Sequence, residues 1–369
     1  MRFGYFFMPL HQPEEDPTLG IESDLRTVEL AEELGYDEFW IGEHHTGGWE
    51  TIPSPEMFLA AASQRTSRIR LGTGVISAPF HNPLEVAERV SLLDHLSRGR
   101  LMVGLGPGLL PTDFRYWGAT TSLNRERIHE QIEILKKLLH GNEPVTHHGT
   151  HYDLDDAWLQ LRPYQSRLPI AITTSGPASS STELAAKYDL MMISGNFIAT
   201  PGVVLREHPD ALELRAAHYG TSTGRHNWRL ATYVYVAETT KQAFDDIRVG
   251  AERFAKRYLT IMAPFLSQVF EDYKGQPLAE IGIEQLARKC HWIIGDPDDV
   301  AAQLDEFNES AGGIEHLLII GGGWQPHHRF QASMDLFARY VMPRFRGSNL
   351  GMGRAFERLQ ASPIIFGDI

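Results

Sequence analysis

Short apolar runs alternate along this chain with longer segments in which apolar residues recur every three or four positions. The first run, residues 2–8, has the length of a β-strand. The segment 21–34 that follows places Leu25, Val28 and Ala31 on one helical face. Because this spacing forms a single stripe on a helix, the start of the chain predicts a strand followed by a helix.

The same alternation continues to residue 346. Seven more strands are predicted, at residues 38–42, 69–75, 100–104, 168–172, 190–194, 230–236 and 316–320. Each precedes a segment with helical spacing, at residues 55–64, 83–96, 123–139, 181–187, about 203–218, from 241 onward, and 331–346. Eight strands with eight helical crossovers predict an α/β protein with a (β/α)8 TIM barrel.

The main alternative is a doubly wound open sheet. No Gly-x-Gly-x-x-Gly motif follows the first strand and no second domain boundary is visible, so the barrel over residues 1–346 is favoured. Three segments do not belong to the alternation of strands and helices. They are an inserted hairpin at about 143–165, an insertion at 259–292 that is either a lid or a surface decoration, and a C-terminal extension at 347–369.

Composition narrows the classes of partner. The formal net charge of −13 argues against binding to nucleic acid or to an anionic membrane surface, since both need clustered Lys and Arg. A single cysteine, Cys290, leaves no intrachain disulfide and no Cys-rich metal site. With no signal peptide and no apolar run long enough to span a bilayer, we expect a cytoplasmic protein that acts on small molecules.

Glu43-His44-His45 directly follows the predicted strand at 38–42. In a barrel of this class the catalytic groups lie where strands end, so this triplet is expected at the active face. Neighbouring side chains on a strand point to opposite faces, and only one of the two imidazoles is therefore expected to act directly. The alternative is that both are hydrogen-bonded structural histidines.

The other strand ends are rich in glycine and short hydroxyl residues, poor in carboxylates and flanked by aromatic residues. This composition suits a flat aromatic cofactor better than hydrolysis by paired carboxylates, although the glycines alone are also explained as turn formers. No spacing typical of a metal site is present, and neither a Gly-x-Ser-x-Gly elbow nor a P-loop occurs. A metal is therefore not expected.

Hydroxyl residues cluster at positions 173–182, where a predicted helix begins. Free backbone N–H groups and the helix dipole make such a start suitable for binding phosphate. The simpler explanation is a helix cap at Ser180 or Ser181 with Glu183 in the first turn. Gly321-Gly322-Gly323, after the last strand, is a rival phosphate site.

Several short motifs occur from residue 1 to about 346. They are Arg2-Phe3-Gly4, Gly35-Tyr36-Asp37, Glu43-His44-His45, Leu71-Gly72-Thr73, His81-x-Pro83, Leu93-Asp94-x-Leu96-Ser97-x-Gly99-Arg100, Asp113-Phe114-Arg115-x-x-Gly118 and Gly295-x-Pro297-x-x-Val300. Together they resemble the bacterial luciferase family of flavin-dependent monooxygenases. Residues 49–56 and Gly106-Pro107-Gly108 are most similar to the branch that contains limonene and diketocamphane monooxygenases.

The resemblance implies an enzyme that uses reduced FMN, supplied by a separate flavin reductase, and O2. The flavin 4a-hydroperoxide of the family would oxygenate a hydrophobic terpenoid or ketone by epoxidation, hydroxylation or Baeyer–Villiger insertion. Relatives pair through their early helices, which implies a homodimer. The alternatives are a deazaflavin-dependent dehydrogenase or reductase on the same barrel, and a flavin-binding homologue without activity.

Site residues follow from the same resemblance. His44 matches the catalytic histidine, with His45 in support, and Gly74-Val75 matches a cis peptide beneath the flavin ring. Gly106, Pro107 and Gly195 depart from luciferases, which makes light emission an unexpected role. The expected cofactor-binding residues are Thr73, Gly74, Val75, Gly106, Arg125, Ser175, Gly176, Ser179, Ser180, Ser181 and Ser194. The expected substrate pocket comprises Met8, Trp49, Phe80, Leu109, Phe197 and Trp324.

Overall fold

Eight parallel strands close into a barrel in the computed structural model, which describes residues 1–195, 205–254, 282–289, 291–321 and 326–361. Neighbouring strands pair around the ring, and β12 closes it by pairing with both β10 and β1. In ring order they are β1 (Arg2–Phe7), β2 (Glu38–Ile41), β3 (Arg70–Thr73), β5 (Leu101–Gly106), β8 (Ile170–Thr174), β9 (Met191–Gly195), β10 (Trp228–Val236) and β12 (His316–Gly321). The predicted (β/α)8 barrel is confirmed, and the open-sheet alternative is wrong.

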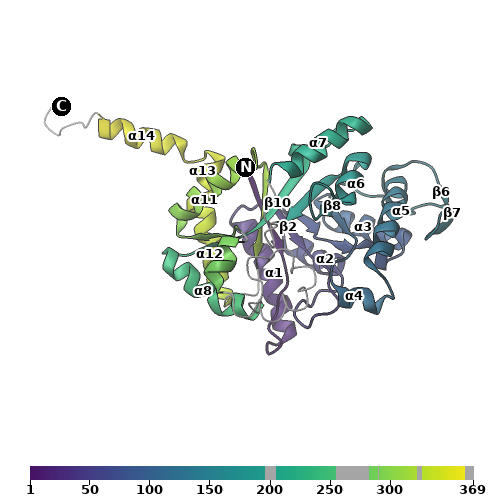
Figure 1. Cartoon of the computed structure of the whole chain (residues 1–369), viewed down its shortest axis with the longest axis horizontal. Helices are drawn as coiled ribbons and strands as arrows, with labels where there is room; N and C mark the ends of the chain where they lie inside the picture. The colour runs from purple at the N-terminus through teal and green to yellow at the C-terminus, as the bar shows by residue number, and fades with distance from the viewer. Residues whose placement is uncertain (196–204, 255–281, 290, 322–325, 362–369) are drawn as a thin grey trace.

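Helices surround this barrel (Figure 1). They are α1 (Pro17–Glu33), α2 (Pro55–Arg65), α3 (Pro83–Leu96), α4 (Pro111–Tyr116), α5 (Thr121–His140), α6 (Ser180–Tyr188), α7 (Glu207–Tyr219), α8 (Thr240–Phe254), α10 (Ile283–Lys289), α11 (Pro297–Ser310), α12 (His327–Leu336), α13 (Met342–Arg346) and α14 (Leu350–Ala361). Short helical turns are η1 (Ala78–Phe80), η2 (Arg225–Asn227) and the π-helical η6 (Phe337–Val341). The predicted helix at 331–346 is thus three consecutive pieces that begin at His327.

The predicted hairpin is present as the antiparallel pair β6 (Val145–His148) and β7 (Asp153–Ala157). Most of the expected lid at 259–292 lies outside the described residues, with α10 the described helix within it. The expected C-terminal extension contains α14, which projects from the body in Figure 1. Three further elements were not predicted: α4, α11 and the short strand β11 (Ile293–Gly295), which pairs with the end of β10. The two-residue strand β4 (Ile76–Ser77) pairs with β5.

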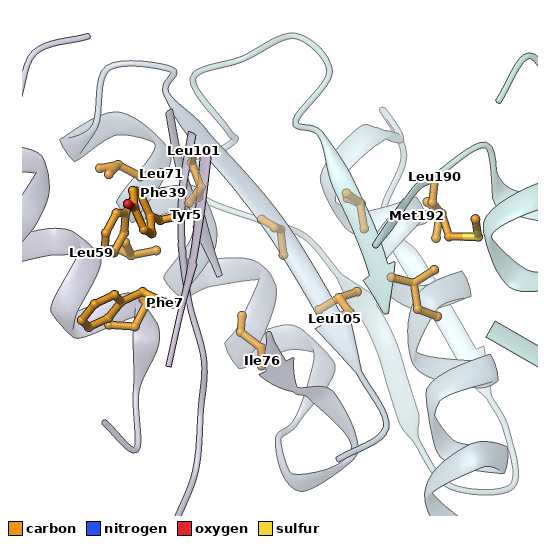
Figure 2. Close-up of a cluster of buried hydrophobic side chains, with 14 of the residues drawn as sticks. Tyr5, Phe7, Phe39, Leu59, Leu71, Ile76, Leu101, Leu105, Leu190 and Met192 are labelled. Carbon is orange, nitrogen blue, oxygen red and sulfur yellow. The ribbon is translucent and has the colours of Figure 1, made fainter. Parts of the chain in front are cut away.

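Two apolar layers stabilise the barrel because successive strand residues face opposite sides. The outer layer packs strand side chains such as Phe39, Leu71 and Leu105 against the helices, as Figure 2 shows. The inner layer fills the barrel around Trp40, which is fully buried. A Cβ on Gly72 would lie 2.2 Å from the Trp40 ring, so the indole fits only beside a glycine.

At the N-terminal end of the strands the barrel interior contains charged groups. Glu38 accepts hydrogen bonds from Arg229 Nε and Nη2, at 2.9 and 2.8 Å, and from Trp40 Nε1 at 2.9 Å. His316 Nδ1 lies 3.1 Å from the same carboxylate. Although burial opposes ionisation, these partners hold the pKa of Glu38 well below its usual range. The barrel is therefore closed at this end by a buried ion cluster.

No helix among the described residues is long and apolar enough to cross a membrane.

Candidate active site

The predicted histidine pair lies directly after β2, at the C-terminal end of the barrel strands. His44 Nε2 is 2.9 Å from Glu50 Oε2, and His44 Nδ1 is 3.4 Å from Asp113 Oδ2. The backbone N–H of His44 also donates to the carbonyl of Ile52 at 3.2 Å. The His44 ring is therefore placed between two carboxylates that come from different segments.

Both carboxylates are themselves positioned by the fold. Asp113 lies in the short helix α4 and accepts a hydrogen bond from the Thr46 hydroxyl, which also contacts Thr112. Glu50 lies in the loop after β2, where it forms an isolated antiparallel bridge with Leu10. Side chains of both acids are 3% exposed, so water screens their attraction to the imidazole weakly.

This environment decides the charge of His44. Burial lowers the pKa of the imidazole, but the charges and hydrogen bonds of Glu50 and Asp113 outweigh it and raise the pKa to about 10. At neutral pH His44 is therefore an imidazolium with a donor at each nitrogen. It can stabilise a developing negative charge or release a proton to it, whereas it is a poor proton acceptor.

His45 has different partners. Its Nε2 lies 2.8 Å from Glu43 Oε1, and His81 Nε2 lies 2.9 Å from the same oxygen. Glu43 Oε2 accepts from the backbone N–H of Ser77 at 3.0 Å. Despite burial, these hydrogen bonds lower the pKa of Glu43 to about 2. The His45 ring packs on Trp117, with 4.3 Å between ring centres. The two adjacent imidazoles thus have separate hydrogen-bond partners.

Two glycines lie where β3 and β5 end. The Gly74–Val75 peptide bond is cis, as the resemblance implies. A Cβ on Gly106 would lie 2.6 Å from Val75 Cγ2 and 2.9 Å from Thr173 Oγ1, so the Val75 and Thr173 side chains pack directly on the Gly106 backbone. The Thr73 hydroxyl is fully buried and bonds to both the N–H and the C=O of Gly104. Thr73 thus joins two strands through its side chain.

The serine turn begins α6. Ser179, not Ser180 or Ser181, is the helix cap, and its hydroxyl accepts from the N–H of Ser181 at 3.2 Å. The two expected cap positions are wrong by one or two residues, because the helix starts at Ser180. Ser175 and Ser180 are exposed, whereas Ser181 is buried.

Hydroxyls of Thr174 and Thr182 fix the carbonyl of Gly176 by hydrogen bonds of 3.0 and 2.9 Å. Part of the hydroxyl cluster therefore builds the turn. The hydroxyls of Ser175 and Ser180 remain at its surface. Of the rival glycine site, residues 322 and 323 lie outside the described part of the chain.

Arg125 lies exposed near the start of α5. Its guanidinium has no hydrogen bond or ion pair with any residue that the structure describes. Its neighbour Asn124 is fully buried and donates from Nδ2 to the carbonyl of Pro107 at 2.9 Å, which attaches the start of α5 to the loop after β5. Arg125 therefore lies close to the loop that follows β5.

Ser194, another expected cofactor-binding residue, lies near the end of β9 with its side chain in the outer layer of the barrel. It is fully buried, and its hydroxyl accepts from Trp228 Nε1 at 2.7 Å. Trp228 and Met192 belong to the outer apolar layer, and Ser194 shares the face of Met192 because side chains alternate along β9. The Ser194 hydroxyl therefore faces the helices and not the barrel interior.

The residues expected to line the substrate pocket differ in where the structure places them. Met8 and Trp49 are buried in the inner apolar layer, where Met8 Sδ accepts from the hydroxyl of Tyr233 at 3.7 Å. Phe80 stacks on Trp117 with 4.7 Å between ring centres, and Leu109 is half-exposed. Phe197 and Trp324 lie outside the described residues.

Four residues at this site were not among the expected site residues: Glu50, His81, Asp113 and Trp117. The first three belong to segments that carry the family resemblance, but nothing in their spacing shows that they contact Glu43 or His44. An available signal is an acidic residue in each of the segments after β2 and β5, since a catalytic imidazole commonly has a carboxylate partner. No group of three or more His, Cys, Asp or Glu suited to a metal ion occurs in the part of the chain that the structure describes.

Comparison with known proteins agrees with this geometry. The family model "Luciferase-like monooxygenase" matches residues 1–313. The chain is 36% identical over 359 residues to 4-hydroxyprotoasukamycin monooxygenase of Streptomyces nodosus subsp. asukaensis, covering 96% of this chain and 95% of the relative. It is 37% identical over 349 residues to limonene 1,2-monooxygenase of Rhodococcus erythropolis, covering 94% and 87%.

Two further similarities bear on the cofactor. An F420-dependent glucose-6-phosphate dehydrogenase of Kineococcus radiotolerans is 30% identical over 331 residues, covering 86% of this chain and 90% of the relative. The oxygenating constituent of 3,6-diketocamphane monooxygenase from Pseudomonas putida, solved in complex with FMN, has the same fold, with a TM-score of 0.80 at 23% identity over 93% of this chain and 98% of that one. The chain belongs to the luciferase-like monooxygenase family.

Proposed function

We propose that this protein is an FMN-dependent monooxygenase that oxygenates a hydrophobic small molecule with O2. The observation that carries the proposal is His44 between Glu50 and Asp113, at the C-terminal end of the barrel strands, where the Gly74–Val75 peptide is cis. The family and the two monooxygenase relatives support the reaction class.

The residues present fit a flavin mononucleotide. The ring would lie against the cis Gly74–Val75 peptide, where Val75 is partly exposed. The phosphate would bind at the exposed serines of the turn before α6 and at the free guanidinium of Arg125. When bound, reduced FMN supplies the two electrons that let O2 deliver one oxygen atom to the substrate and the other to water.

The chain's own contribution is a fixed positive charge and exclusion of water. Glu50 and Asp113 would keep the His44 ring charged and oriented. Because both N–H groups lie against these carboxylates, His44 would donate to an anionic oxygen at the reaction centre by exchanging the longer contact, with Asp113 at 3.4 Å, for that oxygen. The stacked pair Phe80 and Trp117, together with His45, would form an apolar wall that keeps water away.

Finer features of the proposal come from the relatives. We propose a terpenoid or ketone substrate, a separate flavin reductase and a homodimer, with residues 1–346 as the barrel. The dehydrogenase relative favours a second candidate, a deazaflavin-dependent oxidoreductase, because it covers nearly the same length of chain.

Two assays separate the candidates. The protein is incubated with limonene or a bicyclic ketone, in one case with reduced FMN and oxygen and in the other with reduced deazaflavin under anaerobic conditions. We expect an oxygenated product, with one atom from 18O2, only in the first case. Turnover only with deazaflavin and without oxygen would refute the proposal.

The variant His44→Gln tests the central residue. We expect oxygenation to fall by about 10²–10⁴, the usual contribution of a proton-transfer group, while FMN affinity changes little. His147→Gln is the matched control, because it also removes an imidazole bonded to a glutamate, Glu130, but in the hairpin. An unchanged rate in His44→Gln would remove His44 from the reaction.

A sedimentation experiment tests the assembly. A homodimer is expected at the concentration used in the assay, and a monomer there would contradict that part of the proposal.

A further inference from the structure

A cavity lies at the end of the barrel opposite to the candidate active site, where the strands begin. Figure 1 shows the N-terminus at this end of the strands. The cavity has a volume of about 490 Å³. It is lined by the first residues of several barrel strands, among them Arg2 in β1, Arg70 in β3 and Arg229 in β10, and by Lys136 of α5. Catalysis in this fold takes place at the other end, so the proposed function gives this cavity no role.

The lining is cationic although the chain as a whole carries a net charge of −13. Its carboxylates are Asp189 and Glu315. Its arginine and lysine side chains are more numerous: Arg2, Arg70, Arg167, Arg229 and Lys136. Five positive charges against two negative ones leave an excess of three in the lining, with the histidines taken as neutral.

Only some of these cations form ion pairs with carboxylates of the protein. Arg229 is paired with Glu38 beneath the cavity, and Arg167 with Asp189 at 2.5 Å. The side chains of Arg2, Arg70 and Lys136 make no hydrogen bond or ion pair with any residue that the structure describes. Three cations therefore face one cavity with free donors.

These cations also destabilise one another. Burial lowers the pKa of Arg70; the charge of Glu38 opposes that effect, and the charges of Arg229 and Arg2 add to it. Burial likewise lowers the pKa of Lys136, with a further lowering by Arg167 that Asp189 opposes. Charged groups that are partly removed from water and repel each other gain most from an anion placed between them.

We infer that this cavity binds a small phosphorylated molecule, with its phosphate between Arg2, Arg70 and Lys136. A guanidinium matches two phosphate oxygens at once, and lysine adds a point charge. The volume lies within the range of about 300–1,000 Å³ for small-molecule sites and exceeds the space needed by inorganic phosphate alone. The remaining space is lined by hydrogen-bonding side chains, including His226 and Asn227.

The ligand would not reach the active face. Below the cavity the barrel is filled by the Glu38–Arg229 pair and then by Trp40 and Met102, all buried. Binding at this end is therefore independent of flavin binding at the other, and the inference does not depend on the proposed function.

Isothermal titration calorimetry tests the inference on the full chain. Pyrophosphate and adenosine monophosphate are titrated at low ionic strength into the wild type, Arg70→Gln and Lys136→Gln. We expect one site per chain in the wild type and a loss of affinity of about tenfold to a hundredfold in each variant, as for one charge-assisted hydrogen bond. Lys136 lies on a helix surface, so its variant remains informative if Arg70→Gln folds poorly.

Lys241→Gln is the matched control, because it removes the same charge from an 87% exposed side chain of α8. It should bind within twofold of the wild type, as should the wild type saturated with FMN. Absence of binding, or equal affinity in the cavity variants and the control, would overturn the inference. Competition by FMN would assign the anion to the serine turn instead, and equal binding of citrate would overturn the preference for phosphate.

Discussion

The charge of His44 is open to a direct test through Glu50→Gln. The substitution keeps the shape of the side chain but removes the negative charge that lies 2.9 Å from His44 Nε2. Asp113, at 3.4 Å, remains. The charge of Glu50 is the strongest of the influences that raise the pKa of His44 against burial, so the variant should bind this proton much less tightly.

The magnitude follows from linkage between protonation and folding. His44 has a pKa of about 10 in the folded protein against 6.5 for an ordinary histidine, a difference of 3.5 units. Its raised pKa stabilises the fold fully below pH 6.5, and that stabilisation is lost as the pH rises through about 10. At about 1.4 kcal/mol per unit, the contribution is about 5 kcal/mol, of which about 2–3 kcal/mol disappears between pH 7 and pH 9.

Coulomb's law gives a consistent scale. At an effective dielectric constant of about 20, attractions across 2.9 and 3.4 Å are each about 5–6 kcal/mol. Burial of the imidazolium cancels several kcal/mol of that sum. Between pH 7 and pH 9, the free energy of unfolding of the variant is therefore expected to fall by less than half of the wild type's decrease of about 2–3 kcal/mol.

Urea unfolding at pH 7, 8 and 9 measures the free energy of unfolding of both proteins. Glu133→Gln is the control, since it removes a carboxylate from an exposed ion pair with Lys137 and should keep the wild-type dependence on pH. Carbon-13 NMR of labelled histidine, with the His44 signal assigned from His44→Gln, should show a charged ring up to pH 9. Parallel stability curves for wild type and Glu50→Gln, or a midpoint near pH 7 by NMR, would refute the reasoning.

Three further substitutions test the barrel itself, each by urea unfolding. Gly72→Ala places a Cβ 2.2 Å from the Trp40 ring, and overpacking should lower the free energy of unfolding by at least about 1–3 kcal/mol. Glu38→Gln leaves the Arg229 guanidinium buried without its counter-charge and should cost about 3–5 kcal/mol. Ser194→Ala removes the acceptor of a buried indole N–H, so it should cost about 1–3 kcal/mol, while FMN affinity, measured by fluorescence quenching, stays unchanged.

Controls for these substitutions lie on the surface. A Cβ on Gly351 would meet nothing within 4 Å, so Gly351→Ala should change stability little. Glu22→Gln breaks an exposed ion pair with Arg65 and should cost at most about 1 kcal/mol. Equal effects in Glu38→Gln and Glu22→Gln would contradict a buried ion cluster, and weaker FMN binding by Ser194→Ala would place its hydroxyl inside the barrel.

Much of the fold was predictable because the signal is periodic. All eight barrel strands occur within two residues of the predicted starts, since each is a short apolar run between segments with helical spacing. The helices α4 and α11 and the strand β11 were missed. In α4 and β11, six or fewer residues carry too little periodicity to separate them from loops. In α11 the spacing of Val300, Leu304 and Phe307 on one buried face was an available signal.

The sequence predicted which kinds of side chain lie at the candidate site, but it did not predict which of them contact each other. The sequence places His44 after a strand, Ser179 before a helix and Arg125 near the start of another. It does not reveal that Glu50 and Asp113 both reach His44, because these residues lie in separate loops and meet only when the barrel closes. Ser194 illustrates the converse, since a position at a strand end does not show which face its side chain occupies.

The sequence by itself determined the order of strands and helices, the membership of a barrel class and the positions of hydroxyl, glycine and imidazole groups at strand ends. These are local properties of spacing and residue type. Only the tertiary structure decided the charge of His44 and the cationic cavity between Arg70 and Lys136. Both depend on burial and on distances between residues far apart in the chain, and these are set only when the strands close into a ring.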